Sequence, residues 1–224
     1  MPRLALPLIA LVSPLVTLGG GCSLVETTVY GTGDAIQRGS NWLFAKKVNE
    51  DPMIVPVNGP VAVDVDVFAG DITIEVDESL PHALVTITRS AAHGFGRRDE
   101  AEASLAWIDS SVEIGMGELG QALIVRAWTH DEEPWYQRAD IVIQVPEVDG
   151  VRVRTRGRVI AENVYGEIDI RTGDGDVRVL TERPINRPVT IINDFGAVNL
   201  RVRPESSGVL DAAAVRGRVS HQVR

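Results

Sequence analysis

The side chains that could do chemistry in this sequence are aromatic rings and carboxylates, and the aromatic rings gather in one stretch. Trp128, Trp135 and Tyr136 flank the acidic run 131–133. Aromatic planes beside carboxylates can bind sugars or peptides, because the rings stack on apolar faces while the carboxylates accept hydrogen bonds. The sequence favours a structural role, in which Trp128 and Tyr136 face each other across a hairpin and cover the core. The loop is still the best candidate for a ligand site.

Aspartates lie at the turns of the last third of the chain. They are Asp169, Asp174, Asp176 and Asp194. Paired carboxylates are the machinery of glycosidases, but no spacing selects one pair here. In a chain with 31 acidic residues, solvated outer faces explain them better. The string 173–176 (Gly-Asp-Gly-Asp) is reminiscent of calcium-binding β-roll turns, yet the next coil does not repeat it. No catalytic residue is assigned.

Two further patterns are excluded by their context. The string 115–120 matches the dinucleotide fingerprint letter by letter, but a strand is predicted to follow at Ala122, where the phosphate-binding helix should begin. A glycine turn is expected there instead. The histidines show no metal-ligand spacing, and His221 falls at an inward position of its strand. They are His82, His93, His130 and His221. The sequence therefore predicts neither a metal nor a cofactor.

The aspartates lie on a strand-and-turn unit that repeats through residues 150–224. The glycines Gly157, Gly175, Gly196 and Gly217 follow one another at roughly 20 residues, and each precedes an apolar/polar alternation. A second series of alternations, at 168–170, 189–191 and 210–212, lies between them. Alternate side chains point inward, and one coil cannot bury that face alone. Stacked coils of two parallel strands each are predicted; an ordinary β-meander is the alternative.

Earlier alternations predict further strands at 61–67, 72–76, 85–87, 112–116, 122–127 and 139–145. Residues 70–74 repeat the pattern of 175–179, so these strands are expected to open the same stack without a domain boundary. Residues 99–108 carry helical spacing, with Asp99 available as an N-cap. A weaker helical pattern covers 34–48. The sequence predicts an all-β fold, a solenoid-like stack of short strands, with one short helix.

The chain begins with the features of a secretion signal. Arg3 precedes an apolar run, 4–18, that is shorter than the roughly 20 residues needed to span a bilayer. The run 18–22 resembles the bacterial lipoprotein box, in which the cysteine, here Cys22, is acylated and becomes the first residue. An ordinary secreted protein with a leftover thiol is the alternative. We expect a lipoprotein signal peptide over 1–21, a tether over 22–58 and a β-strand-repeat domain over 59–224.

Charge limits the partners. The formal net charge is −9, and the sequence has no basic run. An acidic chain without a basic patch is repelled by phosphate backbones and by anionic lipid headgroups. Nucleic-acid binding is therefore excluded, and the membrane contact is expected to be lipidated Cys22.

The order of these features resembles a family of bacterial envelope proteins called putative adhesins, a β-strand-repeat domain of unknown function. The segments that carry the resemblance are 70–76, 141–146, 164–170 and 175–179. The resemblance implies a right-handed β-solenoid-like fold exposed to the envelope or the outside, and it transfers no catalytic residue.

We therefore expect a lipid-anchored protein of the bacterial cell envelope, in the outer membrane or at the cell surface, that is not an enzyme. Adhesion or scaffolding is the leading function, with a surface glycan or an envelope protein as partner. One alternative is a carbohydrate-active enzyme on a β-helix. Another is a sensor or assembly partner that acts by strand addition at an open last coil, which could also associate edge to edge with a second copy.

Overall fold

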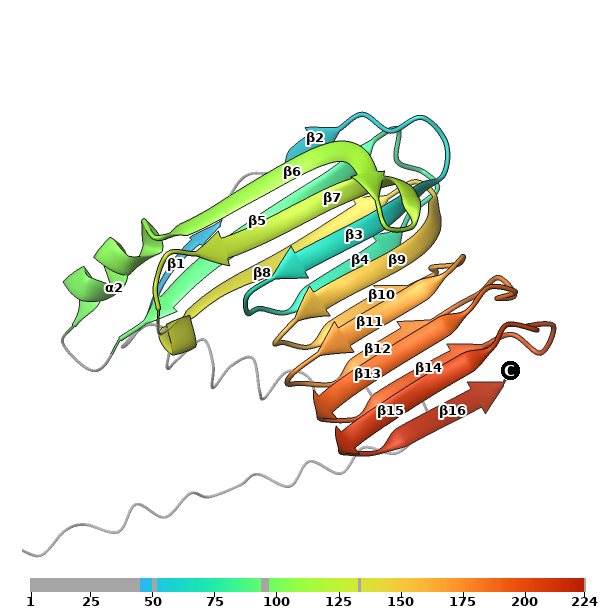
Figure 1. The fold of residues 1–224 in the computed structure, drawn as a ribbon. Coiled ribbons are helices and arrows are strands. Elements are labelled where there is room, and N and C mark those ends of the chain that lie inside the picture. The colour runs from blue at the N-terminus through green and yellow to red at the C-terminus, as the bar shows by residue number, and fades with distance from the viewer. Residues whose placement is uncertain (1–44, 50–51, 94–96, 133, 224) are drawn as a thin grey trace, which may run out of the picture. The chain divides into compact units, whose positions relative to one another are not determined.

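The structure is a computed structural model that describes residues 45–49, 52–93, 97–132 and 134–223 (Figure 1). These residues form strands of two sheets, one short helix α2 (Arg98–Leu105) and a 3₁₀ turn η1 (Pro134–Tyr136). The predicted signal peptide, Cys22 and residues 34–44 of the weak helical pattern lie outside the described residues.

The larger sheet has nine strands and is called the nine-stranded sheet. Its order is β1 (Ala45–Asn49), β5 (Ala83–Ala92), β8 (Gln137–Val145), β4 (Ile72–Val76), β10 (Val159–Glu162), β12 (Val177–Leu180), β14 (Val198–Val202) and β16 (Val219–Val223), with β2 (Met53–Val55) also on β5. The seven-stranded sheet runs β15 (Leu210–Arg216), β13 (Val189–Phe195), β11 (Ile168–Thr172), β9 (Val148–Thr155), β3 (Val61–Val67), β7 (Gly120–Thr129) and β6 (Ile108–Gly117). The prediction of an all-β fold with one short helix is confirmed.

From β9 onward, successive strands alternate between the two sheets, as the orange-to-red half of Figure 1 shows. From β11 onward, each strand pairs in parallel with the strand two places before it, so that Val159, Val177, Val198 and Val219 form one row. The predicted parallel pairing between the strands of successive repeats is confirmed. β3 and β4 pair in parallel with β9 and β10, so the N-terminal strands belong to the same stack, as predicted.

One hydrophobic core lies between the sheets. The alternation that predicts the strands also predicts their inner faces, and Ile168, Ile170, Val177 and Val179 are fully buried in a cluster with residues of β3, β4, β5, β7 and β8. The β-branched side chains suit this position because they pack well on a pleated surface.

The repeated glycines stack on one another at the corners. A Cβ built on Gly157 would lie 2.0 Å from the carbonyl oxygen of Gly70, and one on Gly217 would lie 1.8 Å from that of Gly196. Neither Gly157 nor Gly217 has a positive φ. At these two corners glycine is needed for the close approach of neighbouring strands, whereas Gly175 and Gly196 also have a positive φ.

A ladder of buried polar side chains runs beside the glycines. Thr155, Thr172 and Asn193 share one inward row. Thr155 Oγ1 donates to the Gly70 carbonyl at 2.7 Å, Thr172 Oγ1 to that of Gly157 at 2.6 Å, and Asn193 Nδ2 to that of Gly175 at 2.9 Å. The ladder satisfies corner carbonyls that would otherwise be buried without a partner.

The structure corrects the expectation for residues before 59. β1 and β2 come from the predicted tether and both pair with β5 in antiparallel register. Residues 45–48, the end of the weak helical pattern, are therefore extended.

The helix predicted over 99–108 is confirmed with different ends, since it stops at Leu105 and Ile108 begins β6. α2 begins at Arg98, and its N-cap position is Arg97, which makes no side-chain capping bond. Asp99 lies in the first turn, where a negative charge is favourable, rather than at the cap.

Candidate functional site

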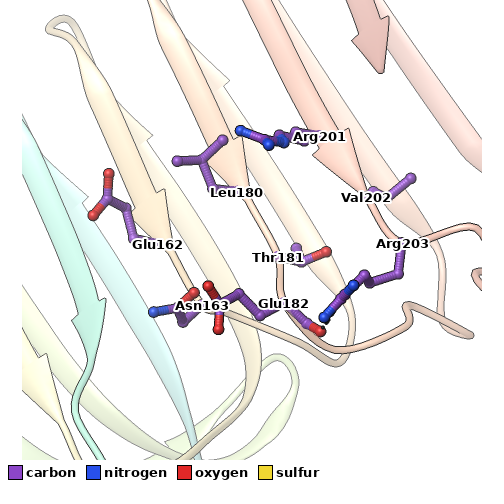
Figure 2. A pocket seen from close by; sticks show the side chains of 8 residues that line it. All are labelled: Glu162, Asn163, Leu180, Thr181, Glu182, Arg201, Val202 and Arg203. Atoms are coloured by element: carbon purple, nitrogen blue, oxygen red, sulfur yellow. Dashed lines mark hydrogen bonds between the residues drawn. The ribbon is translucent and has the colours of Figure 1, made fainter. Parts of the chain in front are cut away.

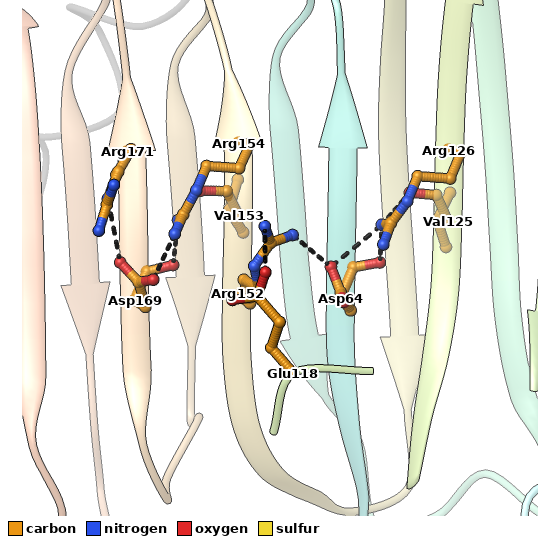
Figure 3. Close-up of polar contacts among 9 residues, drawn as sticks. All are labelled: Asp64, Glu118, Val125, Arg126, Arg152, Val153, Arg154, Asp169 and Arg171. Carbon is orange, nitrogen blue, oxygen red and sulfur yellow. Dashed lines mark hydrogen bonds and ion pairs between the residues drawn. The ribbon is translucent and has the colours of Figure 1, made fainter. Parts of the chain in front are cut away.

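An ion-pair network crosses the outer face of the seven-stranded sheet (Figure 3). Asp64 on β3 accepts hydrogen bonds from Arg126 Nη1 on β7 at 3.0 Å and from Arg152 Nη1 on β9 at 2.9 Å. Arg152 also pairs with Glu118 of the β6–β7 turn at 2.9 Å. Asp64 is only 3% exposed, because the tip of that hairpin covers it. The network ties the hairpin to the sheet.

Burial acts to raise the pKa of the Asp64 carboxyl, but the hydrogen bonds and charges of Arg126 and Arg152 outweigh it and lower the pKa below its usual range. The carboxylate is therefore ionised at neutral pH and has both neighbouring guanidiniums as fixed partners. A carboxyl held in this way is unsuited to proton transfer near neutral pH.

A second group on the same face holds Asp169, one of the candidate carboxylates. Its Oδ2 pairs with Arg154 Nη2, and its Oδ1 lies 3.6 Å from Arg171 Nε (Figure 3). The outward arginines of β9 and β11 thus neutralise an acid on the same sheet. This arrangement stabilises the face more readily than it binds a free anion.

The other candidate carboxylates serve the turns. Asp174 Oδ1 accepts the Gly175 N–H at 2.8 Å, and Asp176 Oδ1 accepts the Ala197 N–H of the next coil at 2.7 Å. Asp194 lies exposed on β13. Arg158, which precedes β10, pairs with Asp71 at 3.3 Å. Among the described residues, no group of three His, Cys, Asp or Glu side chains could hold a metal.

The aromatic loop does not form the predicted hairpin. Trp128 is in β7 of the seven-stranded sheet, whereas β8, after Tyr136, belongs to the nine-stranded sheet. Trp128 instead pairs with Asp109 of β6 and is 42% exposed. The side chain of Trp135 lies outside the described part. The structure places Trp128 and Tyr136 on different elements.

Tyr136 has a different set of neighbours. Its hydroxyl donates to the Asp131 carboxylate, and its ring lies 4.2 Å from the ring of His93, centroid to centroid. These rings line a hollow of about 450 Å³ that also holds Trp107, which is 49% exposed. Trp107 follows α2 and lies far from Tyr136 in sequence, so a local pattern could not find it. Ligand binding by Trp128, Trp135 and Tyr136 stays a prediction.

The histidines lie apart. His130 Nε2 contacts Asp109 at 2.8 Å, and His93 Nε2 contacts Ser104 Oγ at 3.1 Å. His221 stands opposite Leu200 in register, which is the predicted inward row, but it is exposed on the outermost strand β16.

A polar groove that sequence reasoning missed opens on the nine-stranded sheet (Figure 2). Its volume is about 330 Å³. Glu162, Leu180 and Arg201 form one row across β10, β12 and β14, and Asn163, Glu182 and Arg203 lie just beyond the same strands. Three coils contribute to it in turn. A comparison of the equivalent residues in successive repeats, here Glu162, Leu180 and Arg201, would have revealed it.

No family model and no curated protein matches the sequence. A solved structure of a putative cell adhesion protein from Clostridium sporogenes is similar over 80% of this chain and 100% of its own, with a TM-score of 0.51 and 12% identity. This chain has the putative-adhesin fold. The resemblance seen in the sequence is thereby confirmed at the level of the fold.

Two other solved structures are more distant. A putative adhesin from Bacteroides fragilis is 10% identical over 79% of this chain and 97% of its own, with a TM-score of 0.32. A putative lipid binding protein from Parabacteroides distasonis is 8% identical over 80% and 81%, with a TM-score of 0.35. These scores are too low to support an argument about function. Among the described residues of this putative-adhesin fold, no helix has the length and apolar character to cross a bilayer.

Proposed function

We propose that the chain is a lipid-anchored protein of the bacterial cell envelope whose outer strand faces form a non-catalytic surface for adhesion or scaffolding. The observation that carries the proposal is the regular stack itself: the outward carboxylates of Asp64, Asp169 and Asp176 pair with arginines or with a turn amide instead of converging on a reaction centre. Repeating strands offer an extended, rigid binding surface. The similarity to a putative cell adhesion protein supports the same function.

We further propose that the coils from β9 onward form a right-handed β-solenoid. The parallel pairing of every second strand supports this arrangement. Right-handed connection is the overwhelming preference of parallel strands joined by a crossover.

The anchor is proposed at Cys22, after removal of residues 1–21, in the outer membrane or at the cell surface. We expect the Cys22→Ala variant to lose incorporation of labelled palmitate and to leave the membrane fraction, since the two or three acyl chains of a lipoprotein supply the anchoring free energy. Fractionation of cells that express the wild-type chain and the variant measures this. A variant that stays with the membrane would show that the lipoprotein assignment is wrong.

The orientation of the domain is tested on the same cells by protease shaving, with an antibody against the repeats. Digestion of the anchored wild-type chain on intact cells is expected if it serves in adhesion to a glycan or protein outside. Protection of a membrane-bound chain would refute adhesion and favour a scaffold or sensor inside the envelope. Lysed cells are the control, because the protease can then reach the chain whether it faces outward or lies inside the envelope.

A second candidate function is strand addition, including edge-to-edge self-association. β15 and β16 are the outermost strands of their sheets, and Leu210, Val215, Val219 and Val223 are each at least 40% exposed there. Such edges can pair with another strand. We expect light scattering to show concentration-dependent association that Val219→Lys abolishes. A chain that stays monomeric at high concentration would refute this candidate. No described pair of carboxylates favours the carbohydrate-active enzyme.

A further inference from the structure

The groove on the nine-stranded sheet is polarised. Glu162 on β10 and Glu182 after β12 supply carboxylates, while Arg201 on β14 and Arg203 beyond it supply guanidiniums (Figure 2). Because β10, β12 and β14 are neighbours in that order, Glu162 and Arg201 lie on opposite sides of the groove, while Glu182 lies beside Arg203, whose Nε donates to the Glu182 backbone carbonyl at 2.9 Å. The groove therefore presents opposite charges to the two ends of a bound molecule.

The strand spacing keeps these charges apart. Glu162 pairs in register with Leu180, and Leu180 pairs with Arg201. Neighbouring strands lie about 4.8 Å apart, so the backbones of Glu162 and Arg201 are separated by about 9.6 Å. Neither side chain has an ion pair within the described part of the chain, in contrast to Arg126, Arg152 and Arg154 of the other sheet.

Between the charges lie an apolar floor and uncommitted polar groups. Leu180 is half-buried in the middle of the row. Thr181 is 7% exposed, and its Oγ1 has no hydrogen-bond partner among the described residues. Asn163 is the single described residue other than glycine with a positive φ, 58°. Asparagine adopts this left-handed conformation readily in turns, and here the turn after β10 places Asn163 at the lining of the groove.

We infer that this groove binds a short zwitterionic peptide. Its ammonium group lies against Glu162, its carboxylate accepts hydrogen bonds from Arg201, and an apolar side chain rests on Leu180. Guanidinium and carboxylate make charge-assisted bidentate bonds. An extended chain spans about 3.3–3.6 Å per residue, so a tripeptide of about 10 Å matches the separation of the two charged sides.

The inference names a class of ligand for the binding surface proposed above, and it rests on the proposal that this surface binds a partner. It is tested by titrating the purified full-length chain with trialanine in a calorimeter. We expect binding by trialanine, and at least about tenfold weaker binding by N-acetyl-trialanine amide, because each lost charge-assisted bond costs more than that factor. This comparison uses the wild-type chain, so it does not depend on a variant that folds.

Two variants locate the site. Arg201→Gln is expected to weaken trialanine binding at least about tenfold, whereas Arg178→Gln, which removes the same charge from the same sheet outside the groove, should leave it unchanged. Amide resonances of residues 162–163, 180–182 and 201–203 should shift on titration. Absent binding, equal binding of the blocked peptide, or equal effects of the two variants would each overturn the inference. None of these results would alter the outcome of protease shaving. The peptide inference and the proposed surface function can therefore be refuted independently of each other.

Discussion

The Gly157→Ala variant is expected to lose roughly 2–4 kcal/mol of its free energy of unfolding, the cost of forcing a new atom into a packed site. The added Cβ would lie 2.0 Å from the Gly70 carbonyl oxygen, and the contact is with backbone, which cannot rotate away. The carbonyl is also held by Thr155 Oγ1 at 2.7 Å. The coils on either side must therefore separate. Urea unfolding followed by circular dichroism measures the loss.

Gly173→Ala is the matched control for this variant. The nearest atom to its new Cβ, Cγ of Arg156, lies 3.6 Å away, which is an ordinary contact, and its φ is not in the left-handed region. We expect a change within about 1 kcal/mol, and stabilisation is reasonable because alanine narrows the unfolded ensemble. Equal midpoints for Gly157→Ala and the wild-type chain would contradict close packing of the corners.

The Asp64→Asn variant is expected to lose about 3 kcal/mol at pH 7, because it leaves Arg126 and Arg152 beside a neutral acceptor at a buried position. Asp66→Asn, two residues along the same strand, is the control. Asp66 is exposed and has no ion pair within the described part, so its loss should cost little. Unfolding curves of both variants measure the difference.

The cost of Asp64→Asn should also depend on pH. Since the pKa of Asp64 in the folded chain lies below its unfolded value of about 3.9, its contribution is complete above that pH. It is lost as the pH falls through the folded pKa. The stabilities of the wild-type chain and Asp64→Asn should therefore converge in acid. A difference that stays constant down to pH 3 would show that the ionised carboxylate is not what stabilises the network.

Much of the fold follows from apolar alternation. The rows of Ile168 and Val177 predict both strands of a coil because parallel stacking repeats the same inward position. Alternation carries no information about which strand lies next to which. β8 lies between β5 and β4 in the nine-stranded sheet, whereas β7 belongs to the seven-stranded sheet. The chain between Trp128 in β7 and Tyr136 before β8 therefore crosses from one sheet to the other. The predicted hairpin was wrong for this reason.

The candidate site was harder to predict. Glu162, Leu180 and Arg201 differ in chemistry and lie roughly 20 residues apart, so they form no local motif. They become neighbours only through the register of three coils. The role of Asp169 is likewise set by Arg154, which stands on another strand. Repeats predict positions well, whereas the function of a position depends on what the adjacent coil places there.

The stacked corner glycines make each coil interchangeable with the next. Gly157, Gly196 and Gly217 each meet the carbonyl oxygen of the preceding corner glycine, whereas Gly175 lies against the backbone of Arg158. Duplicating or deleting one whole coil would therefore leave each remaining junction intact. Each insertion would lengthen the stack by about 4.8 Å, the spacing of neighbouring strands. A gene for such a chain could adjust how far its product reaches in small, equal increments without redesigning the core.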